Sequence, residues 1–107
     1  MVVIFKTKME FIVVQKNSEH GMLLIVTDSS LIGKKFEEKN LQLDLTKPFY
    51  CGTKCSRSEV KRLMDQARHI HLTGKDAVEL GVETGVVNRK KIITIKGVPH
   101  AEAIVDG

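Results

Sequence analysis

The sequence predicts an α+β fold: a small mixed or antiparallel sheet with an N-terminal hairpin, two central helices and a C-terminal hairpin. Runs of β-branched and aromatic residues near both ends of the chain favour strands. Between them, apolar residues recur at three- and four-residue steps, which is the period of one helix face. Because 107 residues suit one hydrophobic core, and no linker or repeat interrupts them, we expect a single domain over residues 1–107.

The N-terminal part is predicted to be mostly strand. Residues 9–15 (MEFIVVQ) and 22–27 (MLLIVT) flank the turn formers of 16–21 (KNSEHG), which indicates a hairpin. Residues 2–6 (VVIFK) form either an edge strand or a continuation of the first strand. Residues 41–45 (LQLDL) alternate, so their three leucines should share one face of a half-buried strand.

Between these strands, Asp28 and Gly33 bracket a single helical turn, Asp28 as its N-cap and Gly33 at its C-terminal end. The first longer helix begins at Ser56, which has capping-box spacing with Glu59. Its apolar positions recur as far as His71, so we expect the helix to continue that far.

The second helix follows a weaker cap signal over residues 73–76 and ends at Gly85. Its small residues Ala77 and Gly81 share a face, which could let a neighbouring element approach closely. Residues 91–96 (KIITIK) then predict a continuous buried strand, which a turn joins to the alternating strand 100–105 (HAEAIV).

The composition indicates a soluble globular protein, with 42% hydrophobic and 28% charged residues. The first five residues are too short an apolar run for a signal peptide or a membrane span. Two cysteines do not make a disulfide framework, which agrees with a reducing compartment. We therefore expect a cytoplasmic protein that has no contact with membranes.

Several of these segments together resemble a family of small archaeal proteins classified as a domain of unknown function. In that family an acidic residue precedes a Leu-Ile/Leu-Gly-Lys element, matched here by Asp28 and residues 31–34. A Phe-Tyr pair follows the middle strand, matched by Phe49 and Tyr50, and the chain closes on Gly-Val-Pro-His-Ala, matched by residues 97–101. The resemblance spans residues 9–105 and implies an archaeal, cytoplasmic protein without an assigned activity.

The two cysteines, Cys51 and Cys55, are spaced as half of a zinc site, and no second cysteine pair completes it. The candidate completing ligands are the four histidines His20, His69, His71 and His100. On a helix, His69 and His71 would point about 200° apart and could not both bind one ion. We therefore expect no metal and no cofactor, and free thiols or a local disulfide instead.

A ligand site is one interpretation of the C-terminal motif. His100 follows Pro99 at the start of a strand, where an imidazole can act as acid or base or hold an anion. The alternative is a histidine that fixes the turn by bonding a backbone carbonyl, and Gly97 and Pro99 are also typical turn residues. The candidate ligand-binding residues are His100, Asp28, Phe49, Tyr50, Gly97 and Pro99.

RNA binding is the other interpretation, because the formal net charge is +4, with 17 Lys and Arg against 13 Asp and Glu. With only five aromatic residues, Phe49 and Tyr50 are the one adjacent pair available for base stacking. The candidate phosphate-contacting residues are Lys34, Lys35, Arg57, Lys61, Arg62, Arg89, Lys90 and Lys91.

The leading interpretation is a small, non-enzymatic binding module that acts on RNA or a ribonucleoprotein in a translation-related process. The first alternative is an enzyme or small-ligand protein with its site around His100, Asp28 and the Phe49–Tyr50 pair. A second alternative is a subunit that contacts only another protein.

Overall fold

The computed structural model describes residues 10–105, so the strand expected at residues 2–6 lies outside the described residues. The elements are β1 (Glu10–Ser18), β2 (Gly21–Asp28), β3 (Lys35–Glu38), β4 (Leu41–Asp44), β5 (Thr53–Ser56), α1 (Arg57–Met64), β6 (His69–Thr73), α2 (Lys75–Glu83), β7 (Ile93–Ile95) and β8 (Val98–Ile104). Short 3-10 turns cover Ser29–Leu31, Pro48–Tyr50 and Arg89–Lys91.

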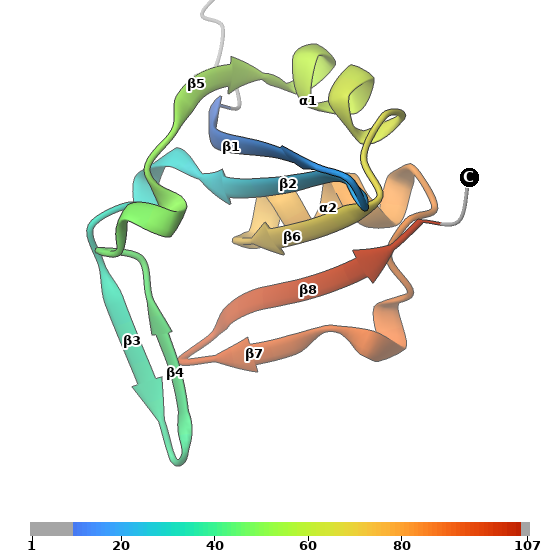
Figure 1. Ribbon diagram of the computed structural model, residues 1–107. Helices are drawn as coiled ribbons and strands as arrows, with labels where there is room; N and C mark the ends of the chain where they lie inside the picture. The colour runs from blue at the N-terminus through green and yellow to red at the C-terminus, as the bar shows by residue number, and fades with distance from the viewer. Residues whose placement is uncertain (1–9, 106–107) are drawn as a thin grey trace, which may run out of the picture.

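Six of the strands form one sheet in the order β5-β1-β2-β6-β8-β7 (Figure 1). Its neighbours are antiparallel except β2 and β6, which run parallel. Strands β3 and β4 form a separate two-stranded hairpin at one end of the molecule. The predicted α+β class, the mixed sheet and both terminal hairpins are thus confirmed.

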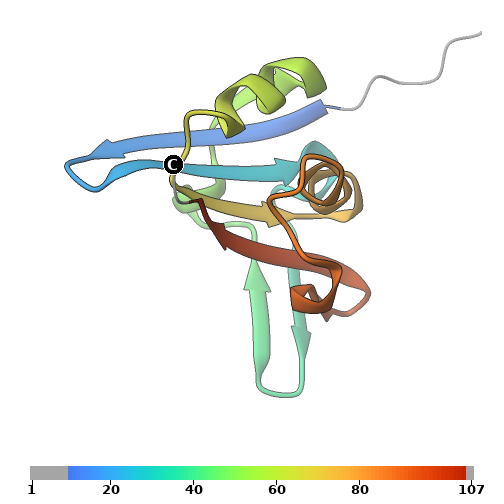
Figure 2. The ribbon, with the colours of Figure 1, turned by 90° about the vertical axis from the view of Figure 1, so that its right-hand side faces the viewer.

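Both helices pack against one hydrophobic core on the same face of the sheet. In Figure 2, α1 lies above β1 and α2 lies toward the right-hand side. Because side chains alternate along a strand, every second residue of the central strands points at the helices. The main core consists of these residues together with the inner sides of the helices; its most buried members are Phe11, Leu24, Val26, Val60, Ile70, Leu72 and Ala77. Neither α1 nor α2 covers the opposite face of β6 and β8.

Helix α1 is shorter than the sequence predicts. Its capping box is present, with the Ser56 hydroxyl accepting from the Glu59 amide and the Glu59 carboxylate accepting from the Ser56 amide. The helix ends at Met64, however, and residues 69–73 form β6. The predicted continuation to His71 is wrong because the alternation of Ile70 and Leu72 with polar neighbours also fits a strand. Pairing beside β2 buries both side chains completely.

Helix α2 takes its N-terminal cap from a distant residue. The Asp28 carboxylate accepts hydrogen bonds from the backbone amides of Asp76 and Ala77, at 3.0 and 2.8 Å. Asp28 makes no side-chain cap to its own 3-10 turn, and Gly74 is the N-cap position of α2. The single turn predicted between Asp28 and Gly33 is present, with Asp28 at its N-cap position and Gly33, with φ of +87°, just after its end. The side-chain cap predicted over residues 73–76 is replaced by the longer-range one from Asp28.

The close approach expected at the small residues of α2 is confirmed. A side chain at Gly81 would overlap Leu72 of β6 and Val87, so only glycine lets the helix lie this near the sheet. Gly85, with φ of +83°, follows the helix end as predicted.

Two strand predictions need correction. The continuous buried strand at 91–96 is a 3-10 turn at Arg89–Lys91 followed by the short edge strand β7, because the Asn88 side chain accepts from the Lys90 amide and starts a turn. In the β3–β4 hairpin, Leu43 and Leu45 are buried in a second small core with Ile95, whereas Leu41 is 47% exposed.

Among residues 10–105, no helix is long and apolar enough to cross a membrane.

Replacing Asp28 with alanine should lower the free energy of unfolding by about 1–2 kcal/mol, because two amides of α2 lose their acceptor. Asp28→Asn keeps one acceptor oxygen and should lose less. Urea denaturation of both variants measures this, with Asp65→Ala at the end of α1 as control. A loss for Asp28→Ala no larger than for the control would contradict the capping role.

Candidate functional site

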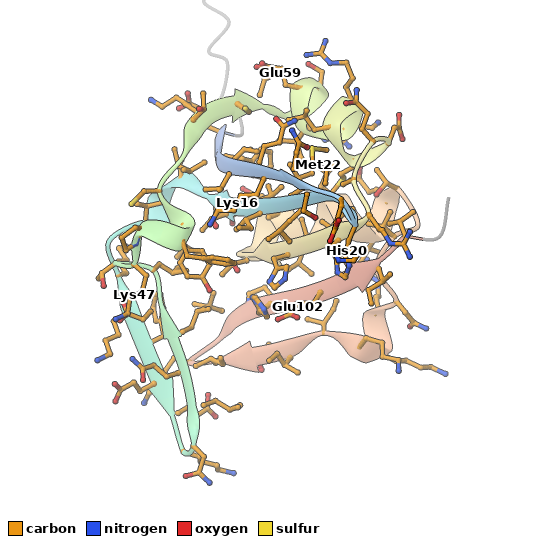
Figure 3. The ribbon with its side chains drawn as sticks, viewed as in Figure 1. Lys16, His20, Met22, Lys47, Glu59 and Glu102 are labelled. Carbon is orange, nitrogen blue, oxygen red and sulfur yellow. The ribbon has the colours of Figure 1, made fainter. Side chains whose placement is uncertain are left out.

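Polar side chains gather on the face of the sheet that the helices leave uncovered. In the strand register His71 of β6 lies opposite Glu102 of β8, and Thr73 lies opposite His100. All four alternate with core residues such as Leu72 and therefore point away from the helices. Figure 3 shows Glu102 on this face, which is turned toward the viewer while α2 lies behind the sheet.

Three contacts join these four residues into one cluster. His100 Nδ1 lies 2.8 Å from Thr73 Oγ1, and His100 Nε2 lies 3.0 Å from Glu102 Oε2. His71 Nδ1 lies 3.6 Å from the same carboxylate oxygen. We call His71, His100 and Glu102 the histidine–glutamate cluster.

The cluster is anchored on one side and open on the other. Thr73 is fully buried and His100 is 8% exposed, whereas the side chain of Glu102 is 60% exposed. Donation from His100 Nε2–H to Glu102 would make Nδ1 the acceptor of the Thr73 hydroxyl, because a neutral imidazole carries one proton. Thr27 adjoins Thr73 in the parallel register, and its buried Oγ1 has no hydrogen-bond partner among the described residues.

Two aromatic side chains, Phe49 and Tyr50, lie beside the cluster. The Phe49 ring meets the His71 ring edge-on, with centroids 5.9 Å apart, and the Tyr50 ring at 5.0 Å. The ammonium group of Lys16 lies 5.4 Å from the centroid of Phe49. Pro48 begins the 3-10 turn that carries both aromatic residues, and its fixed φ suits the first position of such a turn.

A shallow pocket of about 240 Å³ opens beside the cluster and is lined by Lys91, Ile93, His100, Ala101 and Glu102. Two larger hollows, of about 490 and 450 Å³, lie at the β1–β2 turn and beside β5. We place the site at the smaller pocket because it contains a histidine and a carboxylate already in contact, held by a buried hydroxyl.

The cluster shifts the protonation of its members. The hydrogen bond from His100 is the main cause that lowers the pKa of the Glu102 carboxyl, so the carboxylate is favoured. Burial lowers the pKa of His71 below its ordinary value of 6.5, although the nearby Glu102 charge acts in the opposite direction. Burial, followed by the charge of Glu102, raises the pKa of Tyr50.

The cluster also offers ligands for a metal ion. One donor atom from each of His71, His100 and Glu102 lies within 4.8 Å of the others, and over residues 10–105 this is the one such group of three. The cysteines belong to no such group: both are free, Cys51 exposed and Cys55 buried, and Cys55 lies in the core beneath the helices. A cysteine half site is therefore not completed within the described part of the chain.

The other predicted ligand-binding residues have different positions. Asp28 pairs with the core residue Phe11 and caps α2, so it belongs to the helix-covered face and is separated from His100. Gly97, with φ of +79°, makes the turn between β7 and β8, and the Pro99 carbonyl accepts from the Gly74 amide. The predicted site therefore divides into a cluster around His100 and three residues with structural roles.

The predicted phosphate-contacting residues belong to three different segments of the chain. Lys34 and Lys35 lie at the start of the β3–β4 hairpin, Arg57, Lys61 and Arg62 on α1, and Arg89, Lys90 and Lys91 in the last 3-10 turn. Arg57 forms an ion pair with Glu83, and Arg89 with Glu79 at 2.7 Å. These contacts direct part of the positive charge toward the protein's own carboxylates.

Sequence reasoning missed His71 as a partner of His100, and also Thr73, Glu102 and Lys16. The pairing of His100 with Glu102 could have been predicted, because the alternation in the strand HAEAIV places both residues on one face. The segment HIHLT alternates in the same way, but the helical pattern that precedes it concealed this.

Comparisons with known proteins agree with the fold. A family model described as "Protein of unknown function (DUF424)" matches residues 15–105. A crystal structure of an uncharacterized conserved protein from Methanopyrus kandleri superposes with a TM-score of 0.67 at 21% identity, covering 92% of this chain and 96% of that one. No curated protein matches the chain. The resemblance drawn from the sequence is thereby confirmed, and at this identity the structural likeness concerns the fold alone.

The environment of His71 predicts how it titrates. In protein treated with a metal chelator, the imidazole protons of His71 should titrate below 6.5 by NMR. Glu102→Gln should lower that pKa further, because it removes the negative charge that favours imidazolium. Below about pH 6.5, His71 becomes protonated in the unfolded chain before it does in the folded protein. The free energy of unfolding therefore falls as the pH decreases from about 6.5 to the pKa of His71 in the folded protein. An unchanged or higher pKa in Glu102→Gln would contradict the contact.

Proposed function

This chain belongs to the DUF424 family of proteins of unknown function, and we propose that it binds a small acidic metabolite that carries a hydroxyl or amino group. The ligand would lie on the face of the sheet opposite the helices, over the exposed side of the histidine–glutamate cluster. The observation that carries this proposal is the contact of both His71 and His100 with Glu102, beside a pocket that His100 and Glu102 line. The buried Thr73 hydroxyl holds His100 from below.

The groups around the cluster define the ligand chemistry. Lys91 lines the pocket, and Lys16 lies over Phe49, which meets His71. Positive charge on both sides of the cluster favours a phosphate or carboxylate group. Glu102, as a carboxylate, accepts a hydrogen bond from a ligand hydroxyl or ammonium group. The edge of Phe49 gives an apolar contact for the ligand's carbon atoms. His100 and Glu102 in contact also form an acid–base pair of the kind that moves protons in enzymes.

RNA binding is the second proposal, and it rests on the net charge of +4. The distribution of the basic residues supports it less, since they lie in three regions and two arginines are paired with carboxylates. Lys90 and Lys91 at the last 3-10 turn are the best placed, because Lys91 borders the pocket of the cluster.

An archaeal source and a cytoplasmic location are part of the proposal. The source is supported by the similar structure from Methanopyrus kandleri, and the location by the two free thiols. Among residues 10–105, the support for a role as a protein-contacting subunit comes from three exposed apolar residues, Leu41, Ile93 and Ile104. None of the three belongs to either hydrophobic core.

A thermal-shift screen of phosphate esters and hydroxy acids on chelator-treated protein tests the ligand proposal. Hits should raise the melting temperature of the wild type and of the control His20→Gln, whose histidine is exposed at the β1–β2 turn. His100→Gln should remain folded by circular dichroism, at a cost of about 1–2 kcal/mol, and give no shift. Equal stabilisation of His100→Gln, or no hit with the wild type, would count against the proposal.

RNA binding would be electrostatic and nearly independent of base sequence. Affinity for short oligonucleotides should fall steeply with salt, and the triple change of Arg89, Lys90 and Lys91 to alanine should weaken all of them about equally. Fluorescence anisotropy measures this, with Lys47→Ala in another loop as a control for charge. Sequence-selective binding that persists at high salt would argue for a different interface.

A further inference from the structure

We propose that the histidine–glutamate cluster binds a divalent transition-metal ion of the zinc type, with His71, His100 and Glu102 as its three protein ligands. This inference concerns the same site as the proposed function and rests on it for the role of that face. It names the species that the three side chains hold, beside which an acidic metabolite would bind.

The distances within the cluster suit one shared ion. Two donors bound at about 2.1 Å to the same tetrahedral or octahedral ion lie about 3.0–3.4 Å apart. His100 Nε2 and His71 Nδ1 lie 3.0 and 3.6 Å from Glu102 Oε2. All three donors fall within 4.8 Å of one another, so a modest rotation of the exposed Glu102 and of one ring brings them around an ion.

The donor set points to the same class of ion. Two imidazoles and one carboxylate suit zinc and other first-row transition metals, whereas calcium and magnesium prefer oxygen ligands. Three protein ligands leave at least one coordination position open, as in sites where the metal also holds water or substrate. Here that position faces solvent beside Phe49 and Lys91, where an acidic ligand would be drawn.

The buried side of the cluster supplies the second contact that metal-bound histidines usually make. Once Nε2 holds the metal, the His100 proton resides on Nδ1, which then donates to Thr73 Oγ1 across the existing 2.8 Å contact. The Thr73 hydroxyl, no longer donating to His100, is free to turn its hydrogen elsewhere. Thr27 is its neighbour in the register, and among the described residues the buried Oγ1 of Thr27 has no hydrogen-bond partner.

The contact between Thr73 and His100 is buried, which distinguishes the cluster from side chains that happen to lie close together on the surface. The β1–β2 turn provides a comparison, because Glu19 and His20 also approach to 3.5 Å there. Both of those side chains are more than 80% exposed. His69 lines the same hollow, but among the described residues it forms no group of three donors with them. This pair serves as an internal control for nonspecific binding by a surface histidine and carboxylate.

The test is a competition between the chelator-treated full chain and a chromophoric zinc chelator, with Cys51→Ser as the background so that the exposed thiol does not contribute. We expect one zinc ion per chain, with the affinity lowered at least about tenfold by Glu102→Gln and by His71→Gln. Glu19→Gln should bind as the background does. Cobalt should give a visible absorption band that the two site variants lose.

The role of Thr73 as a positioning residue has its own readout. Thr73→Val removes the oxygen that orients His100 and should lower zinc affinity about 10–100-fold, whereas Thr73→Ser should restore it. Circular dichroism of each variant separates loss of metal from loss of folding. Equal affinities of the valine and serine variants would overturn this role.

The outcomes separate the metal proposal from the proposed function. Equal zinc affinity in the background, Glu102→Gln and His71→Gln, or no binding at all, overturns the metal site. Metabolite hits that depend on His100 in chelator-treated protein would then still support the ligand site. Zinc binding without metabolite hits, in both the chelator-treated and the zinc-loaded protein, supports the metal site and overturns the ligand proposal.

Discussion

The pairing of β6 with β2 on one side and β8 on the other is the constraint on which the rest of the structure depends. Only in this position are Ile70 and Leu72 fully buried beneath α2. The same register sets His71 opposite Glu102 and Thr73 opposite His100. Because the side-chain period of a strand is two, a slip of one residue would exchange the core face and the polar face and lose both. Core packing therefore fixes the geometry of the site.

The division of the sheet into two faces also separates the polar residues with structural roles from those of the candidate site. On the helix face the Asp28 carboxylate is used to cap α2, and the missing side chain at Gly81 lets elements pack closely. On the uncovered face Thr73 and His100 are buried polar groups that satisfy each other and leave the outer nitrogen of His100 directed at Glu102. Buried polar groups arranged in this way orient one another, which is a requirement for a binding or catalytic site.

Much of the fold could be predicted from local sequence patterns. The first hairpin, the capping box at Ser56 and the close packing at Gly81 all follow from residue types at fixed spacing. The helix predicted through His71 was wrong because Ile70 and Leu72 fit both a helical and an alternating pattern, and only tertiary pairing decides between them. That error placed His69 and His71 on opposite sides of a helix, although two residues apart on a strand they share a face. His100 could be singled out from its motif, but its partners come from a strand pairing that no local pattern specifies.

The pairing of β6 with β8 is the central claim, and nuclear Overhauser contacts between backbone protons test it most directly. In uniformly labelled, chelator-treated protein, cross-strand contacts should join His71 with Glu102 and Thr73 with His100, in the pattern of an antiparallel pair. Helical contacts between residues three apart should stop before His69. Helical contacts that continue to His71, or a register that sets His71 opposite Ala101 or Ala103, would contradict the account.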